Sequence, residues 1–119
     1  YSQSRTKNLE KLNLAGDKIN DFIEKGNKVA IWGMGRLFDI FYHYGNVEWG
    51  GIKYCIDKFL PDYVSEVNGI NIIKPSDLSN NVSIDILIIF SDAYFKDIED
   101  EAMNIFRDIG LVIQYNKLI

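Results

Sequence analysis

Two glycines that flank a single residue, Gly33 and Gly35, follow an apolar run that begins at Val29, and Arg36 then opens a stretch with helical spacing. Many α/β proteins hold a phosphate group with a strand, a glycine turn and a helix in this order. Gly33 permits a tight turn, and Gly35 lets the backbone approach a pyrophosphate. Free N–H groups at the helix start would bind the anion, and Arg36 would add a direct contact. This loop is therefore predicted to bind a nucleotide phosphate.

The glycine motif is incomplete, which leaves a second interpretation open. In the dinucleotide-binding pattern G-x-G-x-x-G, the third glycine lets the helix pack closely on the strand, and Phe38 stands at that position here. Phe38 also lies off the apolar stripe expected for the following helix. This departure argues against a dinucleotide but leaves a mononucleotide open. The alternative is that Gly33 and Gly35 serve only the turn between strand and helix.

Two further polar side chains are expected at the same edge of the sheet. Asp57 ends an alternating strand about 20 residues after Gly35, the usual spacing for an acid that binds ribose hydroxyls. Ser91 follows the longest apolar run, where it is expected to cap the next helix and to face the same crevice. The simpler alternatives are that Asp57 is a solvated strand end and that Ser91 only caps the helix.

The elements that must position these residues alternate between strand and helix. Gly26 is expected to end an amphipathic helix, and further helices are expected from residue 37 to 44 and from 95 to 106, the last ended by Gly110. In the middle helix, Ile40 and Phe41 belong to the expected buried stripe. Apolar runs predict strands at residues 29–32, 52–56, 84–90 and 111–113, with a short strand within residues 68–75.

This alternation predicts an α/β fold, a single Rossmann-like domain with a doubly wound, mainly parallel sheet of about five strands. Right-handed crossovers would place the first strand in the interior of the sheet. We expect residues 1–26 to form an N-terminal helix that packs on the nucleotide-binding domain of residues 27–119. Ligands of such sheets bind beyond the carboxyl ends of the strands, so Gly33, Asp57 and Ser91 are expected at one crevice.

Composition and charge exclude several classes of protein. The 119 residues carry a net charge of −4 and contain no basic run, which argues against a nucleic-acid partner. The longest apolar run covers only residues 86–90, so no membrane span is predicted. A single cysteine and no signal peptide favour the cytoplasm. Because the chain starts at Tyr1 rather than Met, we expect a fragment of a longer protein.

Residues for a complete catalytic centre do not emerge from the sequence. His43 is the only histidine and is expected on the surface of a helix, while Cys55 is expected to be a small buried side chain. We find no Ser–His–Asp order, paired carboxylates or metal-ligand spacing, and therefore predict no catalytic or metal-binding residue. Whether the chain belongs to an enzyme stays open.

Four stretches resemble a recurrent Rossmann-like domain of bacterial sugar enzymes: KVAIWGMGR, KYCIDK, NGINIIKPSDL and IDILIIFSDAYFKDIEDEA. The chain looks like the amino-terminal domain of sugar O-acyltransferases and the carboxyl-terminal domain of sugar C-methyltransferases and related methyltransferases. In the acyltransferases this domain binds a nucleotide-sugar, which implies that role for Gly33, Gly35 and Asp57. Catalysis in these relatives lies in other domains, so the resemblance implies a module of a larger sugar-modifying transferase involved in polysaccharide biosynthesis.

Three functions follow from these observations. The first is a nucleotide or nucleotide-sugar binding module that works with a linked or associated catalytic domain. The second is a small NAD-dependent oxidoreductase, which Phe38 and the lack of a substrate domain disfavour. The third is a domain without a ligand that serves assembly. The identity of the nucleotide and the formation of a homo-oligomer stay open.

Overall fold

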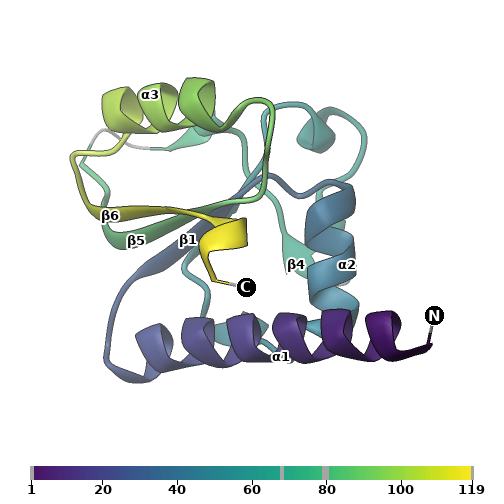
Figure 1. Cartoon of the computed structure of the whole chain (residues 1–119). Coiled ribbons are helices and arrows are strands. Elements are labelled where there is room, and N and C mark those ends of the chain that lie inside the picture. The colour runs from purple at the N-terminus through teal and green to yellow at the C-terminus, as the bar shows by residue number, and fades with distance from the viewer. Residues whose placement is uncertain (1, 68, 79–80, 119) are drawn as a thin grey trace.

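The computed structural model describes residues 2–67, 69–78 and 81–118, without the side chains of residues 2–9, 36, 37, 44 and 67 (Figure 1). The helices of this part are α1 (Ser2–Glu24), α2 (Arg36–Tyr44) and α3 (Phe95–Ile105). Its strands are β1 (Val29–Trp32), β2 (Tyr54–Ile56), β3 (Glu66–Val67), β4 (Ile70–Asn71), β5 (Ser83–Ile89) and β6 (Asp108–Gln114). Short 3-10 turns occupy Trp49–Gly51, Leu60–Asp62, Pro75–Asp77 and Tyr115–Lys117.

Four strands form one parallel sheet in the order β2-β1-β5-β6. Ala30 of β1 lies between Tyr54 of β2 and Leu87 of β5. The first strand is therefore in the interior, as predicted. The chain moves outward from β1 to β2, and later from β5 to β6 in the other direction, so strand order reverses between β1 and β5.

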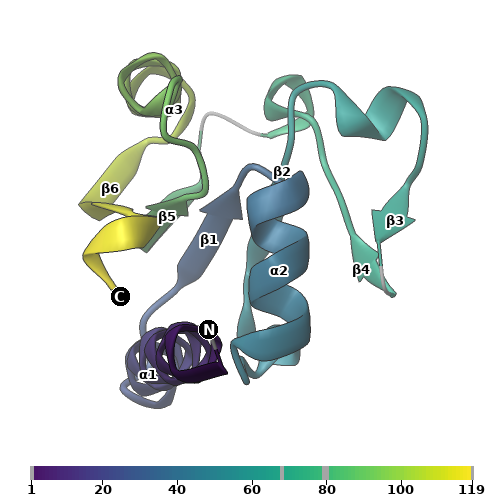
Figure 2. The ribbon, with the colours of Figure 1, turned by 45° about the vertical axis from the view of Figure 1, so that its right-hand side comes forward.

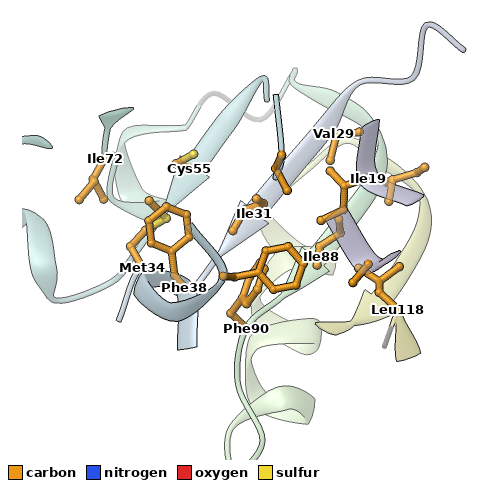
Figure 3. Close-up of a cluster of buried hydrophobic side chains, with 14 residues drawn as sticks. Ile19, Val29, Ile31, Met34, Phe38, Cys55, Ile72, Ile88, Phe90 and Leu118 are labelled. Atoms are coloured by element: carbon orange, nitrogen blue, oxygen red, sulfur yellow. The ribbon is translucent and has the colours of Figure 1, made fainter. Parts of the chain in front are cut away.

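Helices cover both faces of this sheet, α1 and α2 on one face and α3 on the other (Figures 1 and 2). All four residues of β1 are buried, because neighbouring side chains point to opposite faces and both faces are covered. Ile31 faces the core under α1 and α2, which Figure 3 shows, while Ala30 and Trp32 face the core under α3. The continuous apolar run of β1 thus has a direct structural cause.

The first helix packs tightly against the end of α2. Ala15 and Ile19 of α1 are fully buried. Gly26, two residues after the end of α1, has a φ of 86°, which is typical of a glycine that stops a helix. A Cβ atom at Gly16 would lie 1.4 Å from the carbonyl oxygen of Gly45. The two backbones approach so closely that only glycine fits at this crossing.

The buried face of α2 differs from the stripe that the sequence predicts. Ile40 is 39% exposed, whereas Phe38 is fully buried beside Phe41. The ring of Phe38 makes edge contacts with Trp49 at 5.1 Å and with Phe90 at 6.2 Å between ring centroids. Figure 3 labels Phe38 and Phe90 within the buried cluster. The aromatic partners that bury Phe38 come from other segments, so helical spacing alone did not reveal this face.

Residues 68–75 do not add the expected fifth strand to the main sheet. Their described part forms β4, which pairs antiparallel with β3, and Ile73 makes one parallel bridge to Ile56 of β2. Gly69 has a φ of 80°, which turns the chain back on itself. Local pairing therefore replaces long-range pairing over most of this segment.

Gly110 has a different role from the helix end that the sequence predicts. The helix α3 already ends at Ile105, and Gly110 lies inside β6. A Cβ atom at Gly110 would lie 2.6 Å from the carbonyl oxygen of Asp85 in β5. This glycine therefore permits a close approach of two strands rather than ending a helix.

Candidate functional site

Gly33 is required by the fold at the carboxyl end of β1. Its φ of 104° is one that residues with side chains rarely adopt. A Cβ atom there would lie 2.8 Å from the carbonyl oxygen of Phe90. The Gly33 N–H donates to the carbonyl of Ile56 at 2.8 Å, which holds the turn between the ends of β2 and β5.

Gly35, by contrast, faces open space. It precedes α2 with a φ of −87°, and a Cβ atom there would meet no atom within 4 Å. Gly35 is exposed, and no side chain of the described residues caps the helix at this position. The first N–H groups of α2 and their partial positive charge therefore stay accessible to an anion. The Arg36 side chain, predicted to contact phosphate, lies outside the described residues.

The Asp57 carboxylate lies at the predicted edge, and it binds the backbone of two loops. One oxygen accepts the N–H of Met34 in the glycine loop at 2.9 Å. The other accepts the N–H groups of Phe59 at 3.0 Å and Leu60 at 2.9 Å. These three bonds use most of the acceptor capacity of the carboxylate. Binding of ribose by Asp57 stays a prediction, and it would have to compete with these bonds.

Ser91 closes the turn that leads from β5 into α3. Its Oγ accepts the N–H of Tyr94 at 3.1 Å, and its carbonyl accepts the side-chain N–H of Gln114 at 3.0 Å. Tyr94, not Ser91, occupies the cap position of α3, so the hydroxyl serves the turn before the helix. Its contact with a ligand stays a prediction.

A cleft of about 360 Å³ lies beside this edge and was missed by the sequence analysis. Its lining comes from the turn after β2 and from the start of α3: Lys58, Phe59, Tyr94, Asp97 and Glu101. Phe59 is 69% exposed and Tyr94 is 66% exposed. The available signal in the sequence was an aromatic residue in each of the two turns that follow β2 and β5, outside the apolar stripes. The volume falls within the range of about 300–1,000 Å³ for small-molecule sites.

Asp57 connects the cleft with the glycine loop. Its carboxylate bonds to Phe59, which lines the cleft, and to Met34, which lies between the two glycines of the loop. The Lys58 ammonium lies 3.6 Å from the Glu101 carboxylate, both partly exposed. The cleft thus combines two exposed aromatic residues with charges of both signs, and Asp57 links it to the glycine loop that precedes α2.

A family model described as C2185-like, N-terminal, matches residues 25–109 of the chain. The chain belongs to this family. The match contains the glycine loop, Asp57, Ser91 and the whole lining of the cleft. Comparison with curated proteins and with solved structures found no match. The resemblance to sugar acyltransferases and methyltransferases therefore stays a prediction for this C2185-like chain.

Two reactive side chains of the C2185-like domain lie outside this edge. Burial raises the pKa of the Cys55 thiol to about 12, so the thiol stays protonated at neutral pH and is a poor nucleophile. His43 is exposed on α2, 3.5 Å from the Asp39 carboxylate. Within the described residues, no group of three His, Cys, Asp or Glu side chains has an arrangement that could hold a metal ion. The described helices also lack the combination of length and apolar character needed to cross a membrane.

Proposed function

We propose that this C2185-like chain is a Rossmann-like module that binds a nucleotide or a nucleotide-sugar. One observation carries the proposal: Asp57, at the carboxyl end of β2, links a cleft of ligand size to the glycine loop before α2, whose N-terminus no described side chain caps. Ligands of open α/β sheets bind at this edge, where strand order reverses. In the proposed complex, the phosphate lies at Gly35 and the rest of the nucleotide extends toward the cleft.

The charge distribution supports phosphate binding at α2 rather than general attraction of anions. The chain has a net charge of −4, so its overall field repels an anion. The helix N-terminus supplies a local partial positive charge, which stabilises a phosphate by about 0.3–1 kcal/mol, or up to ~2 kcal/mol when the site is partly buried. Open space at Gly35 allows the anion to reach these N–H groups.

We infer that chemistry on the bound ligand is carried out by a catalytic domain that this chain serves. Neither of the two reactive side chains discussed above serves the carboxyl edge, because Cys55 is buried and protonated and His43 is exposed on α2 beside Asp39. The description of the matching family as N-terminal supports a module that forms one part of a longer protein. The resemblance of the sequence to domains of sugar-modifying transferases favours a sugar nucleotide as the ligand.

The matched variants Gly35→Asp and Gly35→Asn test this proposal. Both side chains can cap α2 and have nearly the same size, but only aspartate places a negative charge where phosphate is expected. Calorimetric titration with UDP-, dTDP-, GDP- and CDP-sugars, NAD(H) and inorganic pyrophosphate should identify ligands of the wild-type chain. For these ligands Gly35→Asp should bind at least about 10-fold more weakly than Gly35→Asn. Equal affinities of wild type and Gly35→Asp would overturn the phosphate site.

A further inference from the structure

The cleft beside the glycine loop offers groups that distinguish one nucleobase from another. We propose that it holds the base of the ligand and selects bases with an exocyclic amino group, namely adenine, cytosine or guanine, over uracil and thymine. This inference rests on the proposed nucleotide-binding function. It concerns the side chains that line the cleft, whereas phosphate binding concerns the backbone at the start of α2.

The aromatic residues of the cleft are suited to stacking on a flat ring. Phe59 follows β2 and Tyr94 precedes α3, so their rings belong to two different elements that meet at the cleft. Each of these two residues is about two-thirds exposed, although Phe and Tyr are usually more buried than this. A base that stacks on them would remove apolar surface from water. Stacking on an aromatic ring accepts every base and therefore supplies affinity without selection.

Selection comes from the carboxylates on α3. Asp97 and Glu101 are four residues apart, so they lie on the same face of the helix, and both line the cleft. An ionised carboxylate only accepts hydrogen bonds. The exocyclic amino groups of adenine, cytosine and guanine project beyond the ring and donate such bonds. Uracil and thymine donate at this edge only through the ring N3–H, which lies between two carbonyl oxygens that the carboxylate repels.

Of the two carboxylates, Asp97 is the better acceptor for the base. The ammonium of Lys58 lies 3.6 Å from the Glu101 carboxylate and offsets its charge. Lys58 also lines the cleft, where it can donate to a ring nitrogen or a carbonyl oxygen of the base. Asp97 and Lys58 therefore supply an acceptor and a donor in the lining of one cleft.

The position of Asp57 explains why the base, rather than the ribose, is the selected part. Its carboxylate already accepts three backbone N–H groups, which leaves little capacity for ribose hydroxyls. The same bonds hold Phe59 next to the glycine loop, so a base in the cleft is close to a phosphate at Gly35. The volume of about 360 Å³ is at the small end for ligand sites and fits a base with its ribose better than a whole dinucleotide.

Titration of the purified chain with ADP, CDP, UDP, dTDP and inorganic pyrophosphate tests the inference. ADP and CDP should bind about 10-fold or more tightly than UDP and dTDP, as expected for one hydrogen bond to a charged group. Asp97→Asn should remove most of this preference, because the amide can donate to a carbonyl oxygen as well as accept. The control Asp100→Asn, on the same helix but 3.5 Å from Lys96 and outside the cleft lining, should leave the preference unchanged.

A second variant separates the base from the phosphate. Phe59→Ala should weaken the four nucleotides about 10-fold and leave pyrophosphate binding unchanged. Equal affinities of the wild-type chain for ADP and UDP, with pyrophosphate still bound, would overturn the base selection but leave the phosphate site intact. Failure of the wild-type chain to bind pyrophosphate and every nucleotide would overturn the proposed function itself.

Discussion

The two central strands of the sheet, β1 and β5, are followed by loops that satisfy their backbone groups in different ways. After β1, the N–H groups of Gly33 and Met34 donate to Ile56 and Asp57, acceptors that both come from the region of β2. After β5, the loop closes on itself, because the Ser91 hydroxyl accepts a backbone N–H three residues later. The first loop is therefore positioned from outside, and among the described residues no side chain caps the start of α2.

Contacts with the C-terminal segment reinforce the second loop. The Tyr115 hydroxyl donates to the Asp92 carboxylate at 3.1 Å, and burial together with this carboxylate raises the pKa of Tyr115. Tyr115 also stacks on Phe90 at 5.8 Å between ring centroids. The loop after β5 is thus held by its own side chains and by the C-terminal segment, whereas the loop after β1 is held by Asp57, and no described side chain caps the helix that follows it. This difference is why we place the phosphate at the first loop.

The largest expected effect is the loss of stability in Gly33→Ala. A side chain at a φ of 104° is strained, and its Cβ atom would press against the Phe90 carbonyl. We expect the free energy of unfolding to fall by about 3 kcal/mol and the melting temperature by about 10 °C. Scanning calorimetry measures both. Gly50→Ala, with open space at its Cβ position, is the matched control, and equal melting temperatures for the two variants would contradict the prediction.

Asp57→Ala should have the next largest effect, because it removes the acceptor that positions the first loop from outside. Three backbone N–H groups would lose a charged partner, and we expect a loss of about 2 kcal/mol in a urea unfolding experiment. Hydrogen exchange at the Met34 amide should accelerate, and Asp57→Asn should recover part of the loss. Affinity for a nucleotide, measured per folded molecule, should fall together with stability, because the glycine loop and Phe59 lose the carboxylate that positions them. A 10-fold loss of affinity with unchanged stability would instead assign Asp57 to ribose.

Ser91→Ala should disturb only the self-contained loop after β5. The variant loses one hydrogen bond in an exposed turn, so we expect a loss of about 1 kcal/mol. Amide exchange should accelerate at Tyr94 and stay unchanged at Met34. Ser91→Thr keeps the hydroxyl and serves as the control. Faster exchange at both amides would show that the two loops are coupled and would remove the distinction between them.

The smallest expected effect on stability belongs to Gly35→Ala, although this position shares its motif with Gly33. Its φ of −87° suits any residue, and the added methyl group meets open space. We expect the free energy of unfolding to change by no more than about 0.5 kcal/mol. Thermal unfolding of Gly33→Ala and Gly35→Ala in parallel tests the contrast directly. Losses of similar size would show that both glycines serve the fold.

Local sequence patterns were sufficient to predict a secondary-structure element where the whole segment has one kind of environment. The strands β1 and β5 were predicted from continuous apolar runs, because both of their faces are covered by helices. The end of α1 was predicted from Gly26, whose positive φ is a local property of the chain. The position of Asp57 at the carboxyl edge also follows from the strand that precedes it.

The roles of individual side chains depended on partners that are distant in the sequence. Phe38 is buried because Trp49 and Phe90 contact it, Gly110 is needed because Asp85 passes close by, and β4 pairs with β3 rather than with the main sheet. None of these contacts produces a periodic hydrophobic pattern in the sequence. Helical spacing therefore predicted that Ile40 is buried, but in the structure this residue is partly exposed.

The sequence by itself determined the order of the helices and of the four main-sheet strands and the glycine turn after β1, since hydrophobic periodicity and the conformational freedom of glycine act within a few residues of the chain. Only the tertiary structure decided that Gly33 is held by the fold while Gly35 faces open space, and that Asp57 binds the backbone of two loops. It also decided that Phe59 and Tyr94 share one cleft. The physical reason is that backbone approach and hydrogen-bond partners depend on how the strand ends are brought together, which requires the assembled sheet.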